Sequence, residues 1–118
     1  MSKTSKPAGR VIITHKAIAT LASQAALRSY GVVGMASRNL VDGIVYLLAR
    51  DPRRGVEIRM VDGAVSIELY IVVEYGTRVS SVADSVAHTV RYTVERALGV
   101  PIHAVHIHVQ DLRVSNVD

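Results

Sequence analysis

The segment GVEIRMVDGAVSIELYIVVEYG (residues 55–76) contains two runs of β-branched residues on either side of Asp62-Gly63. This dipeptide is the strongest short-range signal of a β-hairpin, because a type I′ turn requires φ > 0 at both central positions. A two-residue loop pairs Glu57 with Glu68 and separates an apolar face from a charged face. The apolar face would consist of Val56, Ile58, Met60, Val65, Ile67, Leu69, Ile71 and Val73. The segment therefore predicts a long hairpin with one buried face.

A helix and a final strand are expected after the hairpin. The run VSSVADSVAHTVRYTVERALGVP (79–101) has valines at helical spacing, a capping-box pattern at Ser81 and Asp84, and a stop signal at Gly99. The run HAVHIHVQDLRV (103–114) alternates apolar and polar residues as a strand does.

The first half of the chain carries weaker signals. It predicts a short strand at 10–14, a helix at 15–30 with Thr14 as its N-cap, a strand at 32–36 and a short helix at 40–50.

Length and composition indicate one domain. The chain has 118 residues, of which 49% are hydrophobic, which is enough for a buried core. Residues 1–8 are mostly Ser, Lys and Pro and are expected to form a disordered tail before a single domain at 9–118. We predict an α+β fold, a single two-layer domain with helices packed on one face of a mostly antiparallel sheet. The absence of cysteine and of any long apolar run favours a soluble cytoplasmic protein.

No catalytic or cofactor-binding constellation is evident, so we expect a protein that is not an enzyme and has no cofactor or small-molecule substrate. Glu68 and Glu74 would lie about 20 Å apart on one strand, which is too far for shared acid–base work. His106 and His108 would share a face of the last strand, and they are candidates for binding a transition metal. Because no third ligand is evident, a solvent-facing polar surface is the alternative interpretation.

The net charge of +4 raises the question of nucleic-acid binding. The basic residues are scattered among acids, whereas a groove that follows a phosphate backbone requires cations clustered on one face. The motif Gly31-Val32-Val33-Gly34 resembles the GxxG loop of KH domains, but its two valines favour a buried strand. A KH-like nucleic-acid-binding module is therefore kept as the alternative function.

The second face of the long strand is mixed in character. Tyr70 and Val72 stand between Glu68 and Glu74, and apolar side chains on a charged face are typical of a contact patch with a polar rim. We therefore predict that these four residues bind a partner, either another copy of the chain or a membrane-anchored protein. The alternative is that another segment of the same chain, such as residues 40–50, covers them.

Three stretches carry a family resemblance and together span most of the chain. They are GRVIITHKAIATLASQAALRSYGVVGM (9–35), VDGAVSIELYIVVEYG (61–76) and VHIHVQDLRV (105–114). In these stretches the chain resembles the alkaline shock protein family (the alkaline shock protein twenty-three type), bacterial proteins of the general and envelope stress response.

The resemblance implies an abundant cytoplasmic protein without enzymatic activity that self-associates and supports cell-envelope homeostasis. It also implies a peripheral position at the inner face of the cell membrane, held by a small membrane-anchoring protein. Two features depart from the family. His15 and Lys16 occupy the first turn of the first helix, where the family commonly has acids, and the chain is basic overall. These departures indicate that the anchoring partner or surface differs here.

Overall fold

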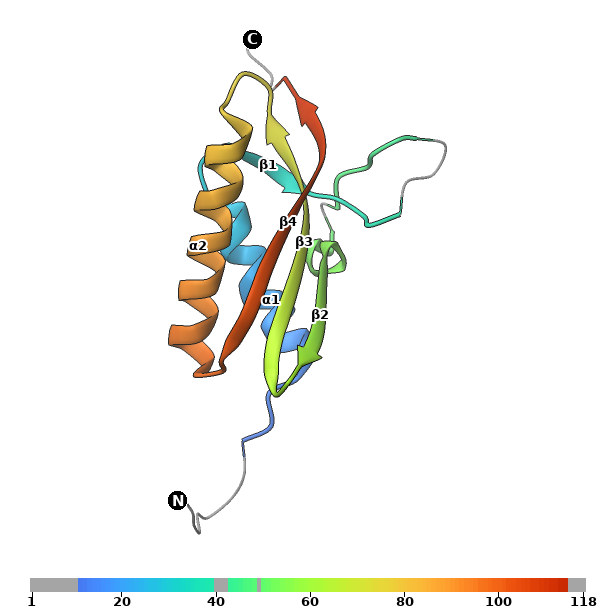
Figure 1. Cartoon of the computed structure of the whole chain (residues 1–118). Helices are drawn as coiled ribbons and strands as arrows, with labels where there is room; N and C mark the ends of the chain where they lie inside the picture. The colour runs from blue at the N-terminus through green and yellow to red at the C-terminus, as the bar shows by residue number, and fades with distance from the viewer. Residues whose placement is uncertain (1–10, 40–42, 49, 115–118) are drawn as a thin grey trace.

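The computed structural model describes three parts of the chain, namely residues 11–39, 43–48 and 50–114. The elements in chain order are helix α1 (His15–Leu27), strand β1 (Val32–Met35), the 3-10 helix η1 (Pro52–Gly55), strand β2 (Val56–Val61), strand β3 (Ala64–Glu74), helix α2 (Val79–Leu98) and strand β4 (Ile102–Arg113). Strand β3 lies at the centre of the sheet (Figure 1). Strands β2 and β1 pair antiparallel with successive parts of one edge of β3, and β4 pairs parallel along the other edge.

The predicted hairpin is confirmed, with Glu57 opposite Glu68. Asp62 and Gly63 have φ values of 50° and 81°, so both central residues of the turn occupy the left-handed region. The turn and the alternation of apolar residues require the same register, because a slip of one residue would move the charged side chains into the core.

Replacing Gly63 with valine is expected to lower the free energy of unfolding by about 1–2 kcal/mol, because an L-residue in the left-handed region is strained. The φ of 81° at this position leaves valine no relaxed alternative that keeps the turn. Thermal unfolding followed by circular dichroism measures the change, and Ala64→Val in the adjoining strand is the control. An unchanged midpoint for Gly63→Val would contradict the assignment of the turn.

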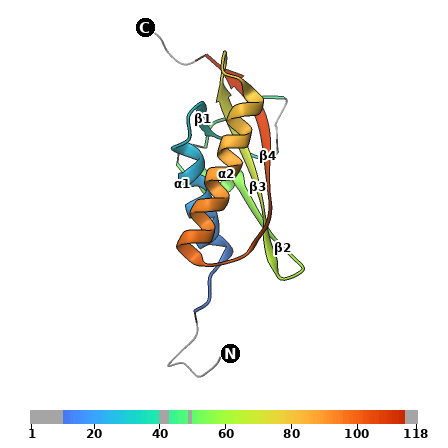
Figure 2. The ribbon, with the colours of Figure 1, turned by 60° about the vertical axis from the view of Figure 1, so that its left-hand side comes forward.

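Both helices pack on the same face of the sheet, as the predicted two-layer α+β fold requires (Figure 2). The core between the layers is aliphatic. It joins alternate residues of β3 to the valines of α2, namely Val65, Ile67, Leu69, Ile71, Val73, Val82, Val86, Val90 and Val94. Because α2 returns the chain to the end of the sheet at which β3 starts, β4 runs parallel to β3 inside an otherwise antiparallel sheet.

The helix ends agree with the sequence in two places and differ in two, one of which is the end of α1 at Leu27, where residue 30 was predicted. The Thr14 hydroxyl accepts a hydrogen bond from the Ala17 backbone N–H at 3.1 Å, so the predicted N-cap of α1 is confirmed. Gly99 ends α2 with a φ of 67°, as expected of a C-cap glycine. The predicted capping box at Ser81 is wrong, because α2 already begins at Val79, whose side chain packs against the core.

Two further predictions for the first half are wrong. Residues 11–14 form no strand, since no strand edge of the described chain pairs with them. Residues 43–48 form no helix but run beside the end of β1, where Leu48 N–H donates to the Met35 carbonyl at 2.8 Å. This contact satisfies backbone groups that a helix would have used internally. The tail at 1–8, residue 10 of the expected strand, and residues 40–42 and 49 of the expected helix lie outside the described residues.

Candidate functional site

The polar side chains of three strands meet on the face of the sheet turned away from the helices, which we call the open sheet face. Strand β2 contributes Glu57 and Arg59, and β3 contributes Glu68 directly opposite Glu57. Strand β4 places His106 opposite Glu68, and His108 opposite Tyr70. Residues far apart in the sequence therefore form one continuous polar surface.

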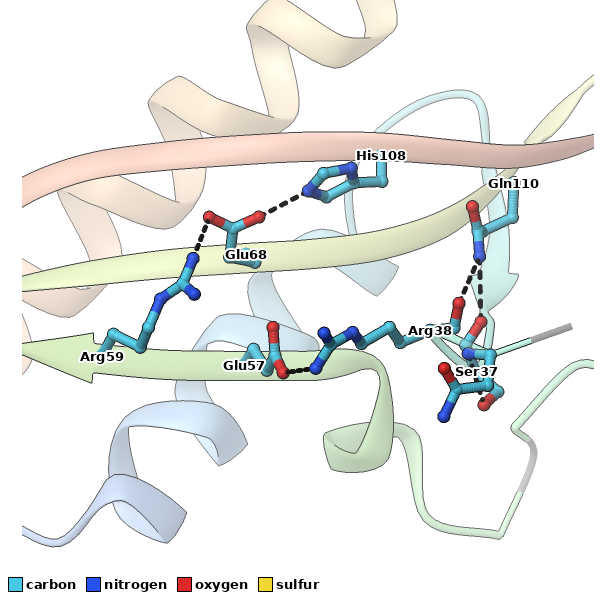
Figure 3. A network of polar contacts seen from close by, with 8 residues as sticks. Ser37, Arg38, Glu57, Arg59, Glu68, His108 and Gln110 are labelled. Carbon is cyan, nitrogen blue, oxygen red and sulfur yellow. Dashed lines mark hydrogen bonds and ion pairs between the residues drawn. The ribbon is translucent and has the colours of Figure 1, made fainter.

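Glu68 is the centre of this surface, although it is only 9% exposed. Its Oε2 accepts a hydrogen bond from the Arg59 guanidinium at 2.9 Å, and its Oε1 lies 2.5 Å from Nε2 of His108 (Figure 3). A buried carboxylate is costly unless it is paired, and here each oxygen has a partner from a different neighbouring strand. Glu68 thus joins β2, β3 and β4 through side-chain contacts in addition to the backbone ladder.

The electrostatic surroundings keep Glu68 ionised. The hydrogen bond with His108 lowers the pKa of the Glu68 carboxyl below its ordinary value of 4.5, and nearby positive charges add to this effect. Burial raises the pKa of this carboxyl group, but the net shift is downward. A carboxyl group with a lowered pKa carries no proton near neutral pH, so it is unsuited to act as a general acid.

Tyr70 completes the cluster by stacking on His108. The ring centroids lie 4.4 Å apart and the ring planes are inclined by 10°. Burial raises the pKa of the Tyr70 hydroxyl above its ordinary value of 10.0. The stacking and the contact with Glu68 together fix the imidazole of His108 in one orientation.

Polar contacts also hold the segment after β1 against the open sheet face. The side-chain amide of Gln110 donates to the carbonyls of Ser37 and Arg38 at 3.0 and 3.3 Å. The Arg38 guanidinium in turn pairs with Glu57 across the face (Figure 3). Further along, the Arg113 guanidinium donates to the Val45 carbonyl.

This segment buries part of the strand that the sequence suggested as a contact surface. Val72 is 0% exposed and packs with Ala36 and Val45 in a small second core. The contact patch expected at Tyr70 and Val72 is therefore wrong, because neither side chain is exposed. Residues of the stretch 40–50 cover Val72, as the alternative interpretation held, whereas the ring of Tyr70 stacks on His108. The covering residues form an extended segment at 43–48 and not a helix.

Of the four residues predicted to bind a partner, Glu68 and Tyr70 both contact His108, whereas Val72 lies in the small second core. Glu74 lies at the far end of β3, opposite Arg113. The contact between Glu68 and His108 was not expected from the sequence, and neither was the bond of Gln110 to the segment after β1. Both depend on the parallel pairing of β3 with β4, which the alternating pattern of β4 does not specify.

The two other candidate motifs can now be placed. His106 and His108 share the open sheet face as expected, but the described residues contain no group of three His, Cys, Asp or Glu side chains that could hold a metal ion. The GVVG motif does not form a loop, because Val32 to Gly34 lie in β1 and pair with β3. The KH interpretation of this motif is therefore wrong.

Replacing Glu68 with glutamine is expected to destabilise the fold by about 1–3 kcal/mol near neutral pH, because the amide cannot accept from both Arg59 and His108. The folded-state pKa of Glu68 is lowered, so its stabilisation is present above pH 4.5 and is lost as the pH falls through the lowered value. The difference between the variant and the wild type should therefore shrink in acid.

Urea unfolding over a series of pH values measures this effect. The matched control is Glu57→Gln, because Glu57 pairs with an Arg38 side chain that is 60% exposed, and a surface pair of this kind contributes at most about 1 kcal/mol. Parallel curves for wild type and Glu68→Gln throughout the acid range would contradict the assigned role of the carboxylate.

Comparisons with known proteins agree with this fold. A sequence model of the alkaline shock protein family, described as having a cell envelope-related function, matches residues 3–114. Protein YloU of Bacillus subtilis is 41% identical over 110 residues, which cover 92% of each chain. Protein Spy1614 of Streptococcus pyogenes is 31% identical over 108 residues, which cover 90% of this chain and 89% of that one.

Among solved structures, the copper form of the MamM CTD is similar in fold, with a TM-score of 0.52 at 16% identity over 88% of this chain and 92% of that one. No helix in the described part of the chain is long and apolar enough to cross a membrane. The family model covers nearly the whole chain, and the two relatives match over about nine-tenths of their lengths. The chain belongs to the alkaline shock protein family of cell envelope-related proteins.

Proposed function

We propose that the protein is a non-enzymatic component of the envelope and general stress response that self-associates and is held at the inner face of the cell membrane by a small membrane-anchoring protein. The observation that carries the proposal is the match of the family model to residues 3–114, with its cell envelope-related function. The protein would work in the cytoplasm as a scaffold, without a cofactor.

The open sheet face supports binding over catalysis. Both oxygens of Glu68 are engaged by Arg59 and His108, and the imidazole of His108 is further held by Tyr70. General acid–base catalysis needs a group that is free to exchange a proton with a substrate. These side chains are instead used to tie three strands together.

The contact surface that we propose lies on the segment that covers Val72. Val45 points into the small second core, whereas Ile44 and Tyr46 are 49% and 62% exposed. Leu47 in the same segment is 37% exposed. We call Ile44, Tyr46 and Leu47 the 44–47 patch. The sequence predicted a partner site around Glu68, Tyr70, Val72 and Glu74. We now propose that the partner binds the 44–47 patch, on the segment that covers Val72.

One charged side chain contacts the segment that carries the patch, because the Arg113 guanidinium donates to the carbonyl of Val45. Arg38, a few residues earlier in the sequence, is exposed and pairs with Glu57. An apolar centre with tyrosine, surrounded by charged groups that stay in contact with water, is the usual composition of a protein–protein interface.

The double change Ile44→Ser with Tyr46→Ser tests the proposal. It should leave the fold intact, because both side chains are exposed, and it should weaken self-association or membrane recruitment by more than about tenfold. Fractionation of native cells and sedimentation of the purified protein measure the two effects. Tyr92→Ser is the matched control, since Tyr92 is an exposed tyrosine on α2. Unchanged recruitment and unchanged self-association in a folded double variant would contradict the proposal.

A further inference from the structure

The outer edge of β2 has backbone groups without a strand partner. In an antiparallel pair the residues alternate between positions that bond across the ladder and positions whose N–H and C=O point outward. Val61 and Ala64 flank the two-residue turn and are a hydrogen-bonded pair of the ladder. Counting back along β2 by the alternation, the N–H and C=O groups of Met60 and Ile58 point away from β3. Within the described chain, β2 pairs only with β3. The edge is therefore available for another strand.

An open groove of about 390 Å³ lies beside this edge, between α1, η1 and β2. Its apolar lining includes Ala19, Val56 and Ile58. Met60 follows on the same face of β2 and is 57% exposed, which is high for an apolar residue of a sheet. An apolar side chain placed over Ile58 and Met60 would gain burial that the isolated chain does not provide.

The rim of the groove carries positive charge. Lys16 and Arg54 line it and are exposed, and neither makes an ion pair with any residue that the structure describes. The two acids of the lining are already engaged, since Asp51 accepts from Arg53 at 2.9 Å and Glu57 pairs with Arg38 outside the groove. The uncompensated charge of the groove is therefore positive.

We propose that the edge of β2 binds an extended acidic segment of a partner protein, which adds to the sheet as a further antiparallel or parallel strand. Its backbone bonds to Ile58 and Met60, an apolar side chain enters the groove, and flanking carboxylates meet Lys16 and Arg54. This mode of recognition takes its affinity from main-chain hydrogen bonds and its specificity from alternate side chains. Binding at the edge of β2 goes beyond the proposed function, because it uses a surface distinct from the 44–47 patch.

Charge argues against a second copy of the chain at this edge. Two copies related by a two-fold axis would present the same surface to each other. The cationic side chains Lys16 and Arg54 would then approach their counterparts, and like charges at an interface disfavour association. An acidic partner removes this repulsion and replaces it with attraction.

A capped, fluorescently labelled peptide of repeated Glu-Thr-Val-Thr-Glu units is a suitable probe, and its binding to the whole chain is measured by fluorescence anisotropy. We expect saturable binding that weakens with added salt. Lys16→Glu and Arg54→Glu should each weaken it by about tenfold. Met60→Pro removes an outward N–H and should abolish binding, whereas Met60→Thr keeps that N–H and should bind nearly as well as wild type.

Circular dichroism establishes that each variant is folded, and the two charge reversals test the site even if the proline variant is not. Equal binding of a peptide with lysine in place of glutamate would overturn the proposal, as would full affinity in a folded Met60→Pro variant. A wild-type dimer that is dissociated by Met60→Pro, without peptide binding, would show that a second copy occupies the edge and would also overturn it. The Ile44→Ser, Tyr46→Ser variant should bind the peptide normally, which separates this test from that of the proposed function.

Discussion

Replacing Gly31 with alanine is expected to lower the free energy of unfolding by about 2–5 kcal/mol, which combines backbone strain of about 1–2 kcal/mol with overpacking of about 1–3 kcal/mol. Gly31 has a φ of 87°, so an L-residue there is strained. A Cβ at this position would also lie 2.7 Å from Cγ2 of Val82, a core residue of α2 that cannot move freely. The midpoint of thermal unfolding should fall by about 10 °C or more.

Gly63→Ala is the matched control for this prediction. Gly63 has nearly the same φ, at 81°, but a Cβ there would meet nothing within 4 Å. Only the backbone strain of about 1–2 kcal/mol should appear. In the double variant Gly31→Ala with Val82→Ala, the shorter side chain makes room, so the two losses should be less than additive. Equal losses for Gly31→Ala and Gly63→Ala would contradict the close contact between Gly31 and α2.

Replacing Val72 with glutamate is expected to abolish folding or to cost at least about 4 kcal/mol, because it buries an unpaired carboxylate. Val72 is 0% exposed and is enclosed by Ala36 and Val45. Glu68 lies four residues earlier on the same face and is tolerated, because Arg59 and His108 satisfy its two oxygens. The side chains that the structure describes in the cluster around Val72, namely Ala36, Val45 and Val33, are apolar and cannot pair with a carboxylate.

Urea unfolding of Val72→Glu measures the loss, and Val72→Ala is the control that removes packing without adding charge. The alanine variant should retain a cooperative transition, with a loss of a few kcal/mol at most. A stable, cooperatively unfolding Val72→Glu protein would show that the segment 43–48 does not cover the strand. Variants at Val72 therefore report on folding, whereas variants of the 44–47 patch test the proposed binding of a partner.

The hairpin and α2 were predictable because local signals agree with one another. The turn at Asp62-Gly63 sets the register of β2 and β3 without reference to the rest of the chain. The valine stripe and Gly99 place α2 and its end in the same way. By contrast, the apolar residues of the stretch after β1 recur at neither helical nor strand spacing. The sequence suggested a helix there, whereas residues 43–48 are extended and lie over Val72.

The candidate site was only partly predictable. The register of the hairpin places Glu57 opposite Glu68, as the sequence predicts. The burial of Glu68 and its contact with His108 depend on the parallel pairing of β4, whose residues lie forty positions away. Parallel pairing is set by how α2 returns the chain and not by any local pattern. The cover over Val72 likewise depends on tertiary packing.

We propose that the exposed 44–47 patch binds another copy of the chain or a membrane-anchored protein in the cell. Photo-crosslinking from position 46, with Tyr46 replaced by a photoreactive phenylalanine derivative in native cells, tests this proposal. We predict crosslinks from position 46 to a second copy or to a small membrane protein, and none from the same derivative placed at Tyr92 on α2. Membrane-associated protein that gives no intermolecular crosslink from position 46 would contradict the proposal.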